Sequence, residues 1–345
     1  MQSGAFGDII TKMTINEFLA EYAPVWRGHT PGHKGKLDPR DITEVPDVFP
    51  ADLIEQAEAR AAKLYGVRAL RFLVGGSSIG IKAAVLATGA KSPVTDIYRH
   101  RAVDEAAFLA GATVTYADSV SGEDGLPVMT TPEDFERAIR KSGATVAVVQ
   151  YPDYYGRAPD LKKTAEAVRS AGAMLIVDSA HGAHFALRPD LFPLGAAGLA
   201  DACNMSAHKT LGAMTQTAFL ALSPALTERA NVMLDALGTT SPNYVLYASL
   251  ESCVDGAAEC AREYDRLKAF SDGLRKRHRC LKNDDFTRVV LDCGAHGGRR
   301  AAHEFYARGI AAEKYDDRYV VFILTPFDGD EELAAFSDAA DEVLG

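Results

Sequence analysis

At 345 residues, with 47% apolar and 24% charged residues, the chain has the composition of a globular protein that buries a substantial core. Its formal net charge of −10 is spread without long acidic blocks, which argues against nucleic acid or an anionic membrane as the main partner. The five cysteines include no CxxC pair and no cysteine–histidine cluster with metal-ligand spacing, so we predict free thiols and no metal site. No signal peptide is evident, and no apolar run reaches the roughly 18 residues of a membrane span, so a cytoplasmic location is expected.

Residues 1–50 are predicted to form an irregular arm. A short helix is expected over residues 14–21, and residues 27–35, rich in glycine, proline and histidine, are typical of a loop. This loop is either a surface turn or an arm that brings His29, His33 and Lys34 near a site. Composition alone leaves both interpretations open.

A possible anion site follows an amphipathic helix predicted over residues 52–65. A strand over residues 71–74 runs into a glycine turn at residues 75–80 and then a helix over residues 81–87. Backbone N–H groups of a first helical turn, with hydroxyls beside them, favour a bound anion. Gly76, Ser77 and Ser78 are therefore candidate phosphate ligands, although serines at such a position also serve as ordinary helix caps.

From there strands and helices alternate. Strands are expected at residues 96–98, 113–116, 145–150 and 174–177, and helices at residues 103–110, 132–141 and 161–171. Alternation of this kind predicts an α/β fold with a mainly parallel sheet covered by helices on both faces. Ligands then bind beyond the carboxyl ends of the strands. The residues at those ends are Gly76 to Ser78, His100, residues 151–156, Asp178 with His181, and residues 206–209.

Two residues of this rim suit pyridoxal phosphate (PLP). The cofactor needs a lysine amine for its Schiff base and an acid that keeps its pyridine nitrogen protonated. Lys209 and Asp178 are the candidates, although the pair taken alone is a weak signal that a generic strand end explains better. His100 either stacks on the ring or is solvated between two arginines, and one of His181 and His184 is expected only to pack or to hydrogen-bond locally.

After residue 222 the alternation stops. Helices are expected at residues 224–237 and 244–278, the second kinked near Gly256 and Gly273. A strand at 288–291, a helix at 299–308, a strand at 319–324 and a helix at 331–343 then suggest a smaller unit. We therefore predict a large PLP-binding domain over residues 51–245, and over residues 246–345 a long helix with a small C-terminal α+β domain.

Several motifs, in this order, resemble the bacterial ornithine/lysine/arginine decarboxylases, PLP enzymes of the aspartate-aminotransferase fold (fold type I). They are TPGHK at 30–34, GSS at 76–78, Asp178 with AHGAH at 180–184, SAHKTL at 206–211 with TQT at 215–217, TSPNY at 240–244 and ASL at 248–250. The resemblance runs from about residue 27 to residue 326. Together these motifs are specific to the family, whereas any one of them would not be.

The resemblance implies a role for each matching residue. Lys209 forms the internal aldimine, Asp178 pairs with the pyridinium nitrogen, and His208 stands beside the aldimine. The implied cofactor-binding residues are Gly76, Ser77, Ser78, His100, Asp178, Ala180, His181, Ser206 and Lys209. A homodimer with shared active sites is also implied, in which Thr240 and Ser241 reach the neighbouring subunit's phosphate.

The chain departs from the family pattern in a few places. Gly75 replaces the usual asparagine, Ser179 the common glutamate and Ser78 a threonine. Family members also continue for over a hundred residues beyond a position like Pro326, so a short form without the usual C-terminal domain is expected.

The resemblance favours α-decarboxylation of a basic amino acid (lysine, arginine or ornithine). The alternatives are an aminotransferase, another PLP lyase, or a PLP-binding homologue without turnover that regulates or partners an enzyme. An aminotransferase typically holds the substrate carboxylate with an arginine of the small domain. The predicted strand 319–324 contains no arginine and has only Arg318 at its edge, which argues against transamination.

Overall fold

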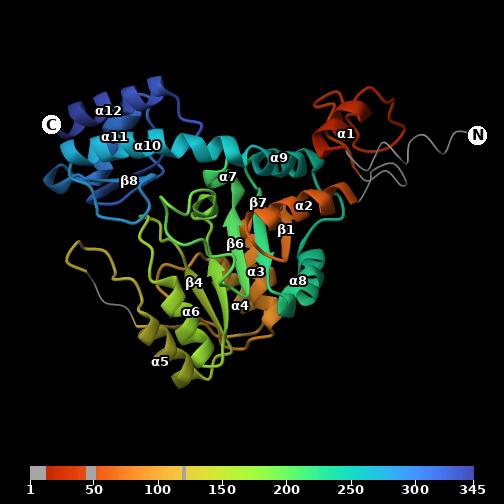
Figure 1. Cartoon of the computed structure of the whole chain (residues 1–345), viewed down its shortest axis with the longest axis horizontal. Coiled ribbons are helices and arrows are strands. Elements are labelled where there is room, and N and C mark those ends of the chain that lie inside the picture. The colour runs from red at the N-terminus through yellow and green to blue at the C-terminus, as the bar shows by residue number, and fades with distance from the viewer. Residues whose placement is uncertain (1–12, 44–51, 119–121) are drawn as a thin grey trace, which may run out of the picture.

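A large mixed sheet forms the centre of the molecule. The computed structural model describes residues 13–43, 52–118 and 122–345 (Figure 1). Within them, seven strands have the order β1-β7-β6-β5-β4-β2-β3. Strands β2 to β6 are parallel to one another, whereas β7 is antiparallel to both β6 and β1, so the predicted mainly parallel sheet is confirmed. Their bounds are β1 Ala69–Leu73, β2 Val94–Thr95, β3 Thr115–Tyr116, β4 Val146–Gln150, β5 Met174–Asp178, β6 Ala202–Ser206 and β7 Ala218–Leu222.

Helices cover both faces of this sheet, as alternating strands and helices require. On one side α3 (Ser77–Thr88) packs between α4 (Ala102–Leu109) and α8 (Pro224–Leu237), and on the other α5 (Pro132–Ser142) packs on α6 (Leu161–Ser170). The central strands are apolar on both faces for this reason. Leu175 and Val177 of β5 join one hydrophobic cluster, and Ile176 between them joins the other.

A second, antiparallel sheet follows in the C-terminal part. Its order is β8-β10-β9, formed by β8 (Arg288–Asp292), β9 (Lys314–Tyr315) and β10 (Tyr319–Ile323). Helices α11 (Gly298–Ala307) and α12 (Asp330–Leu344) lie beside it, and Phe305, Phe322 and Phe336 form an aromatic cluster between these elements. Two short 3₁₀ helices, η2 (Ala183–Leu187) and η3 (Gly294–His296), complete the elements after β5 and β8.

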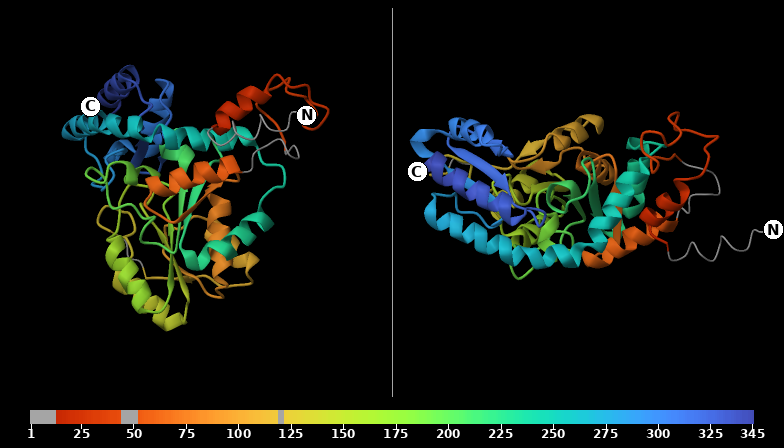
Figure 2. Two further views of the ribbon diagram at one scale, coloured as in Figure 1. Left: turned by 45° about the vertical axis from the view of Figure 1, so that its right-hand side comes forward. Right: turned by 90° about the horizontal axis from the view of Figure 1, so that it is seen from above.

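A long helical connection joins the two sheets. It consists of α9 (Tyr244–Asp255) and α10 (Ala257–Arg277), which run across the top of the large sheet and on to the small one (Figures 1 and 2). The break falls at Gly256, where a kink was predicted, but Gly273 lies inside α10 without interrupting it.

The N-terminal segment docks on this connection. Helix α1 (Ile15–Tyr22) starts with a capping box between Thr14 and Glu17, and the N–H of Ile15 donates to the buried carboxylate of Glu251 in α9. Helix α2 (Asp52–Leu64) packs against β1 and α9. The side chains of His29 and His33 bond to Tyr22 and Asp41, so their hydrogen bonds stay within this segment.

Some predicted bounds were wrong. Residues 96–98 form a turn rather than a strand, because β2 ends at Thr95 and Asp96 then accepts a hydrogen bond from the N–H of Tyr98. Lys209, expected beyond the end of a strand, lies in the short helix α7 (Ala207–Thr210). No described helix is long and apolar enough to cross a membrane.

Candidate active site

The site is built on the carboxyl ends of two neighbouring parallel strands. Asp178 is the last residue of β5 and pairs in register with Asn204 of β6. Strand β6 ends two residues later at Ser206, and α7, which contains Lys209, begins at once. Figure 1 places α7 at the upper end of β6, below the line of α9 and α10.

Asp178 is buried and held in one orientation. Its Oδ1 accepts the N–H of Ala180 at 3.1 Å and the Nδ2 of Asn204 at 3.4 Å. Burial raises the pKa of the Asp178 carboxyl, and the nearby positive charges of Lys209 and His100 oppose that effect. Asp178 therefore needs a cationic partner to be fully ionised.

Lys209 lies within electrostatic reach of Asp178, so the structure brings together the two residues on which the sequence argument depends. Burial lowers the pKa of the Lys209 amine; Arg288 reinforces this shift, while Asp178 and Glu313 oppose it. Its Nζ lies 3.0 Å from His181 Nε2. A lysine with a depressed pKa is a better nucleophile near neutral pH.

Two further residues contact His181: Arg288, which the sequence argument missed, and Tyr154, which lies in the rim segment 151–156. Arg288 opens β8, its side chain is fully buried, and its Nη2 donates to His181 Nδ1 at 2.8 Å. The ring of Tyr154 lies 4.6 Å from the ring of His181, and its hydroxyl donates to Glu313 at 2.8 Å. Arg288 was assigned only to a short apolar strand, and nothing in its local pattern marks it as a site residue.

A second cluster has unsatisfied polar groups that suit an anion. Gly76 precedes the first residue of α3 with a φ of 79°, and that helix has no side-chain cap. Ser77 and Ser78 form its first turn. The Oγ of Ser206 is buried and has no hydrogen-bond partner among the described residues. An uncapped helix start and an orphaned hydroxyl on the adjoining strand fit a phosphate.

The remaining predicted residues are distributed around this rim. His100 is exposed at the start of α4 and influences the pKa of Asp178 through its charge. His208 Nδ1 lies 2.9 Å from the carbonyl oxygen of Thr217 and must donate to it. Thr240 and Ser241 are exposed in the loop between α8 and α9, where Thr240 lines a surface cavity with Gly75. Among the described residues no cluster of histidine, cysteine, aspartate and glutamate could hold a metal ion.

Comparison with known proteins identifies the class of this architecture, which is that of the PLP-dependent enzymes of fold type I. A lysine decarboxylase from Francisella novicida superposes with a TM-score of 0.79 at 14% identity, over 95% of this chain and 59% of that one. The sequence model of the Orn/Lys/Arg decarboxylase major domain matches residues 43–290, and the chain belongs to that family.

Two curated relatives come from Bacillus subtilis. An arginine decarboxylase is 32% identical over 249 residues, covering 65% of this chain and 50% of the relative. The uncharacterized protein YaaO is 32% identical over 248 residues, covering 65% of this chain and 52% of the relative. The chain therefore spans about half the length of the curated relatives it matches.

Proposed function

We propose that the chain is a PLP-dependent decarboxylase of a basic amino acid: lysine, arginine or ornithine. The observation that supports this most directly is the buried Asp178 within electrostatic reach of the Lys209 amine, at the ends of two neighbouring strands of a family member. The names of the relatives, arginine and lysine decarboxylase, favour a basic substrate.

The residues at this rim fit the cofactor. Lys209 offers a half-buried amine for covalent attachment, and Asp178 is a fixed carboxylate for a protonated ring nitrogen. The Ser206 hydroxyl and the uncapped start of α3, with Gly76, Ser77 and Ser78, would hold the phosphate. His100, Ala180 and His181 complete the proposed set. PLP, when bound, supplies an electron-withdrawing ring that stabilises the electrons left on a substrate carbon.

Proton transfer would fall to two side chains. Because His208 Nδ1 donates to the Thr217 carbonyl, its Nε2 is left as the atom that accepts or returns a proton. Lys209 Nζ would be the second such atom. The hydrogen bonds that Asp178 accepts from Ala180 and Asn204 would hold its carboxylate in the orientation that meets a ring proton.

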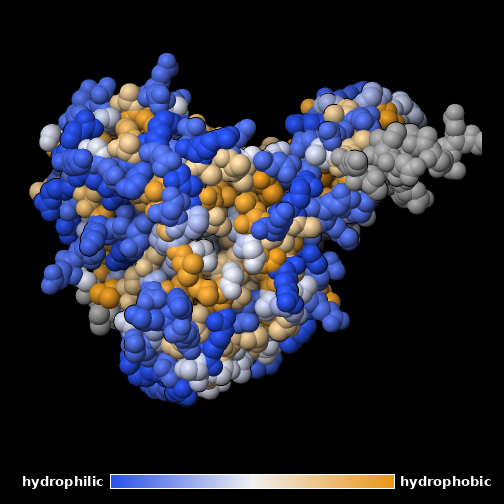
Figure 3. All heavy atoms as spheres, in the orientation of Figure 1, coloured by the Kyte–Doolittle hydropathy of each residue, from blue (hydrophilic) through white to orange (hydrophobic). Residues whose placement is uncertain are grey.

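We also propose a cytoplasmic homodimer with shared active sites, in which Thr240 and Ser241 reach the partner's phosphate. Apolar side chains gather over the middle of the face drawn in Figure 3, which supports an interaction between subunits there. Both loop residues are exposed and therefore available to a second subunit.

A second candidate, transamination, is favoured by Arg288. This arginine of the small sheet is close enough to Lys209 to influence its pKa, and its Nε and Nη1 have no partner among the described residues. A guanidinium fork that held the substrate carboxylate would protect it from loss. Decarboxylation remains the preferred function because the Arg288 side chain is fully buried and one of its nitrogens is already bound to His181.

One assay tests these candidates together. Purified protein is incubated with PLP and lysine, arginine or ornithine, and both CO₂ and 2-oxo acid are measured. Decarboxylation predicts CO₂ with the matching amine, and a visible absorbance band that Lys209→Ala abolishes. A 2-oxo acid instead would establish transamination, and bound PLP without any turnover would establish a regulatory or partner homologue. Absence of cofactor binding would refute the whole proposal.

A further inference from the structure

His181 lies between the side chains of Arg288 and Lys209. Arg288 Nη2 lies 2.8 Å from its Nδ1, and Lys209 Nζ lies 3.0 Å from its Nε2. His181 is 3% exposed and Arg288 is fully buried, so water does not compete for these contacts. A flipped imidazole would present carbon atoms to both neighbours and lose both hydrogen bonds, so this ring orientation is the one that satisfies them.

The direction of each hydrogen bond follows from what the groups can do. A guanidinium has only donors, so His181 Nδ1 must accept, and it can do so only without a proton. A neutral imidazole then has its single proton on Nε2, which makes Nε2 the donor toward Lys209. An ammonium has no lone pair with which to accept that bond. The chain of contacts is consistent only if the Lys209 nitrogen is an unprotonated amine.

We propose that Arg288 is a positioning residue that fixes His181 as the neutral tautomer protonated on Nε2, and that His181 thereby holds Lys209 as the free amine, ready to attack an aldehyde. The lone pair that attacks a carbonyl carbon exists only on the neutral amine, and the condensation then releases one water. This role rests on the proposed function of Lys209 as the residue that attaches the cofactor.

The charges around Lys209 and His181 come from several elements. Arg288 of β8, His100 before α4 and His184 of η2 all disfavour a cationic His181, and burial lowers its pKa further than any of them. Asp178 of β5 and Glu313 before β9 act in the opposite sense on Lys209, since each favours the ammonium form. Burial and Arg288 outweigh these two carboxylates, because the net shift of the Lys209 pKa is downward.

The first test reads the tautomer directly. The full chain is labelled with ¹⁵N-histidine and freed of carbonyl ligands, and the His181 resonances are assigned from their loss in His181→Phe. We expect a protonated Nε2 and an unprotonated Nδ1 from neutral to mildly acidic pH. Wild-type protein with the proton on Nδ1, or on both nitrogens, would overturn the proposal.

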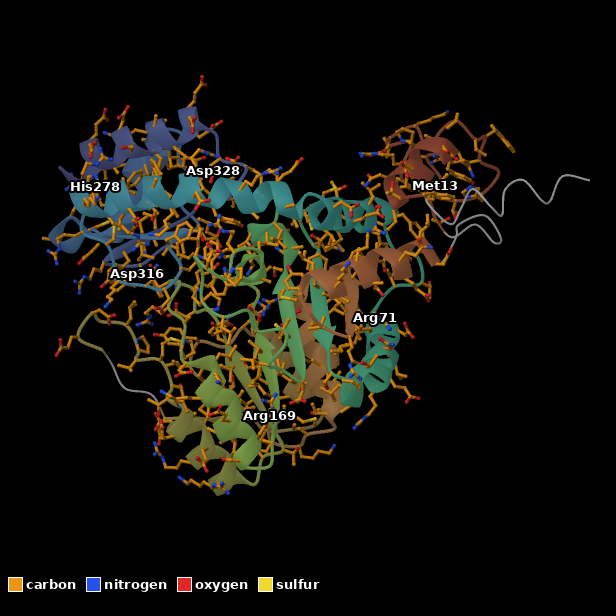
Figure 4. All side chains as sticks on the ribbon, in the orientation of Figure 1. Met13, Arg71, Arg169, His278, Asp316 and Asp328 are labelled. Atoms are coloured by element: carbon orange, nitrogen blue, oxygen red, sulfur yellow. The ribbon has the colours of Figure 1, made fainter. Side chains whose placement is uncertain are left out.

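Variants then test whether Arg288 controls the His181 tautomer or only packs beside it. Arg288→Met should allow His181 Nδ1 to take up a proton, whereas Arg288→Lys, which keeps a charged donor, should retain more of the wild-type pattern. Arg71→Met is the matched control, because Arg71 of β1 (Figure 4) bonds to Glu58 and Asn231 and to neither His181 nor Lys209. An Arg288→Met spectrum identical to that of wild type would mean that Arg288 is merely structural.

The amine itself is tested by trace labelling with acetic anhydride. The neutral amine takes the acetyl group while acetate leaves and the amine proton goes to solvent, so the rate reports the unprotonated fraction. In His181→Phe we expect the pKa of Lys209 to rise. Its rate of acetylation at neutral pH should then fall about tenfold for each unit of that rise. Unchanged labelling would refute the link between His181 and Lys209. Neither the ¹⁵N resonances nor the acetylation rate requires PLP or turnover. Failure of the proposed link from Arg288 through His181 to Lys209 is therefore distinguishable from failure of the decarboxylase proposal.

Discussion

His184 Nε2 lies 3.4 Å from the carboxylate of Asp285, and this buried pair joins η2 of the large sheet region to the start of the small one. Asp285 also accepts hydrogen bonds from the hydroxyl of Thr287 at 2.6 Å and from its N–H at 3.0 Å. Asp285 lies three residues before Arg288 and Thr287 lies one residue before it, so the pair of His184 and Asp285 fixes the segment that presents Arg288 to His181.

Asp285→Ala should therefore be strongly destabilising. The Asp285 carboxylate faces the His184 ring and accepts from the N–H and the hydroxyl of Thr287, and each buried donor left without its acceptor usually costs about 1–3 kcal/mol. Denaturant unfolding of the two proteins measures it. The matched control is Asp272→Ala, whose carboxylate forms an exposed pair with Lys268 and should contribute no more than about 1 kcal/mol. Equal losses in the two variants would contradict the buried pair.

The pH dependence of this effect has a definite sign. Burial opposes ionisation of Asp285, but the positive charges of His184 and Arg288 and the hydrogen bonds outweigh it and lower its pKa. A carboxyl group whose pKa is lower in the folded state stabilises that state. This stabilisation is fully present above the pKa of the unfolded state, about 3.9, and is lost as pH falls through the pKa of the folded state. The stability difference between wild type and Asp285→Ala should accordingly shrink in acid.

The loss of the Ser206 hydroxyl should weaken phosphate binding without unfolding the protein. Its buried Oγ has no partner among the described residues, so Ser206→Ala should leave the free energy of unfolding of the unliganded protein unchanged or slightly higher. A hydrogen bond to a charged group contributes about 1.5–3 kcal/mol, so PLP affinity should fall roughly tenfold to a hundredfold.

A titration of PLP against each variant checks this expectation. Ser223→Ala is the matched control, because its Oγ is also buried without a partner but lies beyond the opposite end of β7. That substitution should leave PLP affinity unchanged. If both variants bound PLP as wild type does, Ser206 would not be a phosphate ligand.

The sheet and its rim were predictable because their signals are local. Buried parallel strands have continuous apolar runs, and Asp178 and Lys209 follow two of them, so the topology alone brings them to one edge. The end of β2 was misplaced because Asp96 to Tyr98 looks like a strand but is closed into a turn by the Asp96 carboxylate.

Arg288 could not be predicted, because its role depends on contacts across the chain. It lies 107 residues from His181 in sequence and reaches it only after the small sheet has folded against η2 and the large sheet. The sequence search for an arginine in the small domain considered the strand at 319–324, whereas the arginine that approaches Lys209 opens β8. Position in a strand does not reveal which side chain faces the neighbouring domain.

Asp178→Asn should separate stability from catalysis. Burial raises the pKa of Asp178, so in the unliganded protein this carboxylate favours the folded state below its unfolded pKa and costs stability as pH rises through the folded value. The amide should therefore raise the unfolding midpoint at neutral pH but not in acid. The amide has no negative charge to stabilise a protonated ring nitrogen of the cofactor. Turnover should therefore fall by about a hundredfold or more.

The control for this variant is Asp96→Asn. Asp96 is also buried, and burial raises its pKa to about 7, so the amide should stabilise the unliganded protein in the same way. Because Asp96 has no proposed contact with cofactor or substrate, turnover should stay close to wild type. An equal loss of turnover in both variants would argue against the role assigned to Asp178.

Gly156→Ala should displace Arg288 from its place behind His181. Gly156 has a φ of 81°, and a Cβ there would lie 2.7 Å from Arg288 Cβ and 2.9 Å from Asn283 Nδ2. Gly172 provides a matched control with a φ of 82° and open space around an added Cβ. Both alanine variants should lose about 1–2 kcal/mol of stability to the left-handed backbone, and Gly156→Ala about 1–3 kcal/mol more to overpacking.

Unfolding free energies measure the difference between the Gly156→Ala and Gly172→Ala variants, and the His181 ¹⁵N resonances should shift in Gly156→Ala alone. Equal destabilisation with unmoved resonances would show that Arg288 tolerates displacement without consequence for the site.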